Sequence, residues 1–240
     1  MKTVFGGILG LMLNLTVLCA FFVAFLLLHP NSPLPNAFHP LKPLRIDDPL
    51  TFVTRWKLDE IAQQPALCSV LLEVAATGYE EREDFTQSEA CGISQRVFLS
   101  SIRKTTIGPI ETQCHIALRI ALWERHVVQP MAEAIYSEPV EEILTQGSYN
   151  CRTVRTEGGS ATRMSEHATA NAIDVRGFKL SSGREITLID DWNGFDADRG
   201  FLRELRDGGC KVFNTTIGPD YNQLHADHFH LDAGPFRVCR

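Results

Sequence analysis

The chain of 240 residues has almost no charge at its start and no closely spaced cysteine pair. Lys2 is the only charged residue among the first 41, and without it the remaining 22 basic and 29 acidic residues give a formal net charge of −7. This acidic balance argues against nucleic acid as a partner. The length suits one domain with a sizeable core plus an extension, rather than several large domains.

Residues 4–28 are uncharged and almost wholly apolar, and a helix needs about 20 such residues to cross the hydrocarbon core of a membrane. A cleaved signal peptide has a shorter apolar region that ends in a small-residue cleavage motif, and no A-x-A sequence ends this one. We therefore expect residues 1–28 to be an uncleaved signal-anchor, with cleavage as the alternative. Lys2 favours a cytoplasmic N-terminus, which places the rest of the chain outside the cytoplasm.

Six of the seven cysteines follow this segment, without any C-x-x-C spacing, and Cys19 lies within it. An even number of cysteines in an exported domain predicts up to three disulfides. Six buried thiols are the alternative. Many pairings are possible, and the simplest set joins sequence neighbours: Cys68 with Cys91, Cys114 with Cys151, and Cys210 with Cys239.

Six prolines in residues 29–50 exclude a continuous helix and favour an extended, polyproline-like linker. We expect residues 51–240 to form one catalytic domain of the α+β class, with a small antiparallel sheet flanked by helices. Apolar spacing predicts helices over 51–78 (broken at Pro65), 111–136 (kinked or ended at Pro130) and 196–206. Loop and short strands are expected over 79–110, and strands at 140–144, 172–178, 185–189, 211–213 and 229–231.

Two distant stretches, residues 165–175 and 227–231, contain the candidate functional residues. On a strand, Ile173 and Val175 would point into the core and Asp174 the other way, into a cleft. The same alternation gives His228 and His230 a common face. Two imidazoles and a carboxylate are a ligand set that zinc takes in hydrolases, with a fourth position left for water.

Several motifs resemble the bacterial extensin-like C-terminal domain family over about residues 50–240. They are Cys91-Gly92-Ile93, Gln129-Pro130, Ser148-Tyr149-Asn150-Cys151-Arg152, Ser165-Glu166-His167-Ala168, Ala172-Ile173-Asp174, Gly218-Pro219-Asp220-Tyr221-Asn222 and Asp227-His228-Phe229-His230-Leu231-Asp232. The pattern S-x-H-x6-D, followed by an acid three residues before a final His, also resembles the zinc D-Ala-D-Ala peptidases, whose superfamily includes lysostaphin-type peptidases and hedgehog domains.

This resemblance implies that Zn²⁺ is held by His167, Asp174 and His230, with Asp227 as the general base. The peptidases have Glu where this chain has Asp227, which is shorter and on an ideal strand faces away from His230. His228 is therefore the second candidate for the base, since its unperturbed pKa lies near neutrality.

Two further residues acquire roles from the same resemblance. Arg152 would bind a substrate carboxylate or the oxyanion, and Ser165 would be a supporting or substrate-binding hydroxyl. Each candidate also has a structural interpretation, such as a loop hydrogen bond for His167 or an ion pair for Arg152. A serine hydrolase built on Ser165 is disfavoured because no G-x-S-x-G elbow surrounds it.

The expected function is a single-pass inner-membrane zinc hydrolase whose periplasmic domain cleaves amide bonds in peptidoglycan peptides. One alternative is a zinc-stabilised protein that binds peptidoglycan or another envelope component without turnover. A metal-free structural domain of the envelope is a further alternative.

Overall fold

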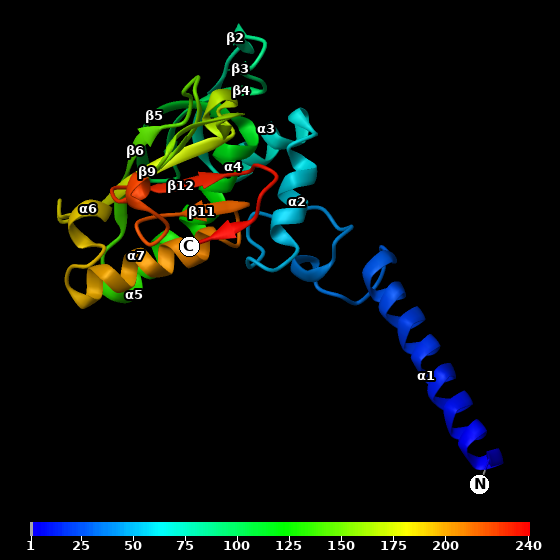
Figure 1. Cartoon of the computed structure of the whole chain (residues 1–240). Helices are drawn as coiled ribbons and strands as arrows, with labels where there is room; N and C mark the ends of the chain where they lie inside the picture. Colours follow the sequence, from blue (N-terminus) through cyan, green and yellow to red (C-terminus); the bar gives the residue numbers. More distant parts are fainter. Residues whose placement is uncertain (1) are drawn as a thin grey trace.

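A computed structural model describes residues 2–240, apart from the side chains of residues 2–9 and 160, and shows a long helix leading into an α+β body (Figure 1). The helix, α1 (Lys2–Leu28), extends away from the body. Its stretch Gly10–Leu28 has a mean hydropathy of 2.6 and is not buried anywhere against the rest of the chain. Within the described residues, it is the one helix long and apolar enough to span a membrane.

Residues 29–50, which we name the neck, do not form the extended linker that their prolines predict. The neck is bonded to the helix before it, because Ser32 Oγ donates to Leu26 O at 2.8 Å. It is also bonded to the helix after it, because Lys57 Nζ donates to Asn36 O at 2.7 Å. The prolines exclude a continuous helix, as expected, but the chain between them is folded and attached at both ends.

The helices of the body cover one large sheet. Their bounds are α2 (Thr54–Ile61), α3 (Pro65–Val74), α4 (Cys114–Trp123), α5 (Gln129–Tyr136), α6 (Leu188–Asp191) and α7 (Asp196–Gly209), with 3₁₀ helices η1 (Asn36–Phe38), η3 (Glu166–Thr169) and η4 (Gln223–His225) and a π-helical turn η2 (Glu124–Val128). The helix expected over 111–136 begins three residues later, at Cys114. It continues through η2 into α5, and the wider π-helical turn lies directly before Pro130, whose missing N–H interrupts the helical hydrogen bonds at that point.

Within residues 2–240 nine strands form one mixed sheet in the order β1-β4-β5-β6-β9-β12-β11-β13, with β10 paired to β9. Their bounds are β1 (Thr77–Glu81), β4 (Arg96–Ile102), β5 (Thr105–Gln113), β6 (Val140–Gly147), β9 (Ala172–Leu180), β10 (Glu185–Thr187), β11 (Thr215–Ile217), β12 (Phe229–Asp232) and β13 (Val238–Cys239); the separate hairpins are β2 (Phe85–Ser88) with β3 (Cys91–Ile93), and β7 (Thr153–Thr156) with β8 (Gly159–Met164). The expectation of a small, antiparallel sheet is wrong on both points, since β5 with β6 and β11 with β13 run parallel.

Two local expectations also need correction. The region 79–110, expected to be loop and short strands, supplies β4 and most of β5, which pair over most of their length. Residues 211–213 form a turn after α7 rather than a strand. Val212 and Phe213 are fully buried in that turn, so their apolar character reflects core packing and not strand pairing.

The core lies on the side of β9 opposite Asp174. Phe178 of β9 packs edge-on against Trp123 of α4, with ring centroids 5.7 Å apart, and against Phe201 of α7 at 5.6 Å. Ile173 of the same strand is fully buried. Because successive side chains alternate across a strand, the buried neighbours Ile173 and Val175 set Asp174 on the other face of the sheet. Phe178 also reaches the core because the register of β9 against β6 shifts between Val175 and Gly177.

Three disulfides join the six cysteines that follow α1 in the described chain, and only one pair is the predicted one. Cys210–Cys239 is confirmed, whereas the other bonds are Cys68–Cys114 and Cys91–Cys151. The neighbour rule fails because α3 packs on α4 and β3 lies beside η3, so the nearest cysteine in space is not the nearest in sequence. Disulfides of this kind are typical of domains outside the cytoplasm.

Two glycines of α7 give a matched test of the packing. A Cβ at Gly208 would lie 2.2 Å from Val127 Cγ1 of η2, whereas a Cβ at Gly200 would meet nothing within 4 Å. We expect Gly208→Ala to lower the free energy of unfolding by about 1–3 kcal/mol through overpacking. Gly200→Ala should raise it by about 0.5–1 kcal/mol, since alanine is the better helix former. Urea unfolding followed by circular dichroism measures both, and a neutral Gly208→Ala would contradict the packing of α7 on η2.

Candidate metal centre

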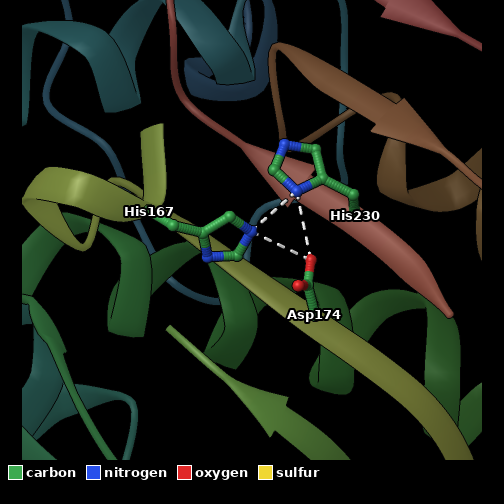
Figure 2. A group of neighbouring side chains, drawn as sticks. All are labelled: His167, Asp174 and His230. Carbon is green, nitrogen blue, oxygen red and sulfur yellow. Dashed lines mark hydrogen bonds and ion pairs between the residues drawn. The ribbon is translucent and has the colours of Figure 1, made fainter. Parts of the chain in front are cut away.

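Three side chains from distant parts of the sequence converge on one face of the sheet, over the neighbouring strands β9 and β12 (Figure 2). His167 comes from η3, Asp174 from β9 and His230 from β12. His167 Nε2 lies 3.0 Å from His230 Nδ1, and each of these nitrogens lies 3.1 Å from Asp174 Oδ1. The structure thus brings together the three residues that the sequence predicts as metal ligands.

The local sequence explains why these residues meet. The backbone N–H of His167 donates to Ser165 Oγ, which caps η3, and Ala170 ends η3 in the left-handed conformation and turns the chain into β9. Strand β12 then pairs with β9 in a register that sets His230 directly opposite Asp174. Directly opposed residues of antiparallel strands share a face, so both side chains point to the same side of the sheet.

Outer hydrogen bonds fix which nitrogen of each imidazole faces the centre. His167 Nδ1 lies 2.7 Å from the carbonyl oxygen of Ser148, which can only accept, so this nitrogen carries the proton. His230 Nε2 lies 3.0 Å from the carboxylate of Asp232 and donates to it in the same way. With the proton on the outer nitrogen, a neutral imidazole at each position has its lone pair on the inner nitrogen, His167 Nε2 or His230 Nδ1, which is the form that binds a metal ion.

The electrostatics of this cluster favour a positive charge. Burial would raise the pKa of Asp174, but the hydrogen bonds with His167 and His230 outweigh burial and hold it well below its usual range. Burial would lower the pKa of His230, yet Asp174 and Asp232 raise it to about 9. A metal ion and a proton would thus compete for His230 Nδ1, as is usual for imidazole ligands.

The donor set fits zinc. Two imidazole nitrogens and one carboxylate oxygen are the ligands of many catalytic zinc ions. With bonds of about 2.0–2.2 Å, neighbouring ligand atoms of a tetrahedron lie roughly 3.3–3.6 Å apart. The observed separations of 3.0–3.1 Å are close to this range, so a small outward movement of the side chains admits the ion.

The two candidates for the general base occupy different positions. His228 Nε2 lies 3.7 Å from Asp174 Oδ1 and faces the centre. Its other nitrogen, Nδ1, donates to Asp227 Oδ1 at 2.7 Å. Asp227 is half-exposed and accepts a hydrogen bond from Gln146 Nε2. Its pKa is lowered chiefly by the hydrogen bond with His228. The two residues form a chain of contacts toward the centre, with His228 at the inner end.

A pocket of about 740 Å³ opens over this centre and contains the two remaining predicted residues, Arg152 and Ser165. Arg152 forms no hydrogen bond with the residues of the cluster. Its guanidinium donates to Thr153 O at 3.3 Å, and no carboxylate of the described chain forms an ion pair with it. Ser165 is buried and its Oγ is engaged in capping η3. Arg152 is thus available to an anionic ligand, whereas Ser165 has a structural role already.

His225 is a further residue of this pocket. Its ring centroid lies 5.3 Å from that of His228 and 6.0 Å from that of His230. Burial, together with the charges of His230 and His228, lowers its pKa to about 4. Its Nδ1 lies 2.6 Å from Asn222 Oδ1. The sequence signal was its position three residues before His228, which a short 3₁₀ helix turns toward the same pocket.

These features define an α+β protein with a two-histidine, one-aspartate cluster beside an open pocket. The family model described as "Extensin-like protein C-terminus" matches residues 66–240, and the chain belongs to that family. Comparisons with curated proteins and with solved structures found no match.

Proposed function

We propose that the protein is a zinc-dependent hydrolase of amide bonds in peptidoglycan peptides, acting as a carboxypeptidase or endopeptidase. The observation that carries the proposal is the convergence of His167 Nε2, Asp174 Oδ1 and His230 Nδ1 beside a pocket that His230 lines and that is large enough for a peptide. Membership of the extensin-like family is compatible with it. The likeness of the motifs to D-Ala-D-Ala peptidases supplies the reaction class and the substrate.

In the proposed hydrolysis, the side chains at and beside the cluster have different roles. Zinc held by His167, Asp174 and His230 would polarise the scissile carbonyl and lower the pKa of the attacking water. His228 Nε2 faces the centre with its lone pair, because Nδ1–H is committed to Asp227, and it accepts the proton of that water. In this proposal Asp227 is a positioning residue and His228 is the base, which reverses their order in the sequence-based expectation.

Arg152 serves the substrate in the same proposal. Its guanidinium lines the pocket without a carboxylate partner, and the negative charge of Asp174 is near enough to act on the pKa of Arg152. A guanidinium in such a position binds a peptide carboxylate or the oxyanion that develops on the carbonyl.

We further propose that α1 anchors the protein in the inner membrane, with the body in the periplasm. One apolar helix at the N-terminus and three disulfides in the body support an anchored, extracytoplasmic domain. Peptidoglycan lies in that compartment, so location and substrate agree.

Metal content and product formation, measured together, test the function. The full chain in detergent should contain about one zinc per polypeptide by mass spectrometry and release new fragments from purified peptidoglycan on chromatography. Removal of zinc with a chelator should stop release, and added zinc should restore it. One zinc without fragments would identify a zinc-stabilised binding protein instead, and no zinc would refute the metal centre.

Asp232 gives a graded prediction at the same site. Asp232→Asn replaces a carboxylate acceptor of His230 Nε2–H with a neutral amide. Outer partners of this kind change metal affinity by about 10- to 100-fold. We expect weaker zinc binding of that order in competition with a chromophoric chelator, with the metal still bound at saturating zinc. Unchanged affinity would show that Asp232 does not tune His230.

A further inference from the structure

We propose that the neck and the start of α2 lie on the lipid bilayer and hold the body against the membrane in a fixed orientation. The surface concerned, which we name the juxtamembrane patch, consists of Phe38, Leu41, Phe52 and Trp56. This inference rests on the proposed anchoring of α1 in the membrane but not on the metal centre, because none of these residues lines the pocket beside that centre.

Exposed apolar side chains are concentrated in this segment. In the part of the chain that the structure describes, fourteen large apolar side chains after α1 are exposed, and four of them lie in residues 38–56, which make up less than a tenth of that length. Phe52 is 78 % exposed, and its ring lies 6.3 Å from that of Phe38. Clustered exposed apolar groups of this kind mark a surface that contacts a partner or a membrane.

The occupant follows from the attachment of the neck to α1. His39, which is fully buried, donates through Nε2 to the carbonyl oxygen of His29, one residue beyond α1. Lys42 Nζ donates to the carbonyl oxygens of Ser32 and Leu34, both at 3.0 Å. These bonds fold residues 29–42 over the end of α1, so the patch cannot swing far from the point where α1 leaves the membrane.

The other end of the neck is bonded equally to the body. Thr51 Oγ1 donates to Ala37 O, and His126 Nε2 of η2 donates to Ile46 O at 2.7 Å. Arg125, also of η2, forms an ion pair with Asp47. The neck therefore transmits the position of α1 to the body, and Figure 1 shows the neck and α2 on the side of the body from which α1 departs.

The chemistry of the patch suits the interface between headgroups and acyl chains. Phenylalanine, leucine and tryptophan gain free energy by burial there, and tryptophan is enriched at that depth. The contact needs no net charge, since the only basic side chains between Phe38 and Phe52, Lys42 and Arg45, are balanced by Asp47 and Asp48. A lipid without net charge, such as the zwitterionic phosphatidylcholine, should therefore suffice.

Tryptophan quenching by brominated lipids tests the proposal on the full chain. Trp56 is the exposed member of the three tryptophans, because Trp123 and Trp192 are buried. The emission of Trp56 is obtained as the difference between the fluorescence of the wild-type chain and that of the Trp56→Phe variant. In proteoliposomes of phosphatidylcholine brominated near the headgroup, we expect this difference to be quenched. Unbrominated lipid is the reference.

A matched pair of sites sharpens the measurement. Phe52→Trp and Phe195→Trp, each in the Trp56→Phe chain, place the probe at positions that are 78 % and 81 % exposed, so neither change disturbs the core. Phe195 is the residue directly before α7, and Figure 1 shows α1 extending away from the part of the body that contains α7. We expect strong quenching at position 52 and none at 195. Equal quenching at the two positions would overturn the proposal, and so would quenching at position 52 that requires anionic lipid. Burial of position 52 against a second copy of the chain would also overturn it.

Discussion

His230→Ala is expected to abolish stoichiometric zinc binding and, with it, hydrolysis of peptidoglycan peptides. The substitution removes one of the three proposed ligands and leaves the carboxylates of Asp174 and Asp232 without their imidazole partner. Two remaining ligands do not make a closed or catalytic zinc site. Mass spectrometry after dialysis should find about one zinc per wild-type chain and essentially none in the variant.

The control for this variant lies in the same pocket. His225→Ala removes an imidazole whose centroid is 6.0 Å from that of His230 but whose Nδ1 is bonded to Asn222, so zinc should stay bound. Asp174→Asn is the complementary test, because it keeps the size of the side chain and removes its charge. Circular dichroism establishes that each variant is folded. A folded His230→Ala chain with full zinc would show that the ligand set is wrong.

The sequence predicted the arrangement of this cluster because strand alternation is a local rule. Ile173 and Val175 are fully buried and Asp174 is on the opposite face, as their alternation requires. The spacing of His228 and His230 likewise placed both in the pocket. Hydrophobic periodicity also located the helices α2, α3 and α7, because each has an apolar face against the core.

The rest could not be predicted because it depends on contacts between distant segments. Nothing near His167 in the sequence identifies Ser148 O as the acceptor that fixes its tautomer, since the contact requires the end of β6 to lie beside η3. The disulfides Cys68–Cys114 and Cys91–Cys151 have the same origin. The folded neck was missed for another reason: proline restricts the backbone but does not exclude hydrogen bonds made by the residues between prolines.

Proton transfer gives the second large prediction. His228→Gln should lower the rate of hydrolysis by about 10²–10⁴-fold at unchanged zinc content, the range typical of a lost general base. Asp227→Asn should lower it less, because His228 Nε2 still faces the centre but its orientation and tautomer are no longer fixed by a carboxylate. Initial rates on one peptidoglycan fragment, measured beside the zinc content of each variant, provide the comparison.

The double variant decides whether the two residues act as one unit. If Asp227 works only through His228, Asp227→Asn should add little to the loss caused by His228→Gln, since residues that act together are not additive. If Asp227 were itself the base, Asp227→Asn would cost at least as much as His228→Gln, and the double variant would fall further. Gln146→Ala supplies a background control, because it removes the other hydrogen bond of Asp227 and leaves the contact with His228 in place. A rate close to that of the wild type in Gln146→Ala, with a large loss in His228→Gln, would assign the proton to His228.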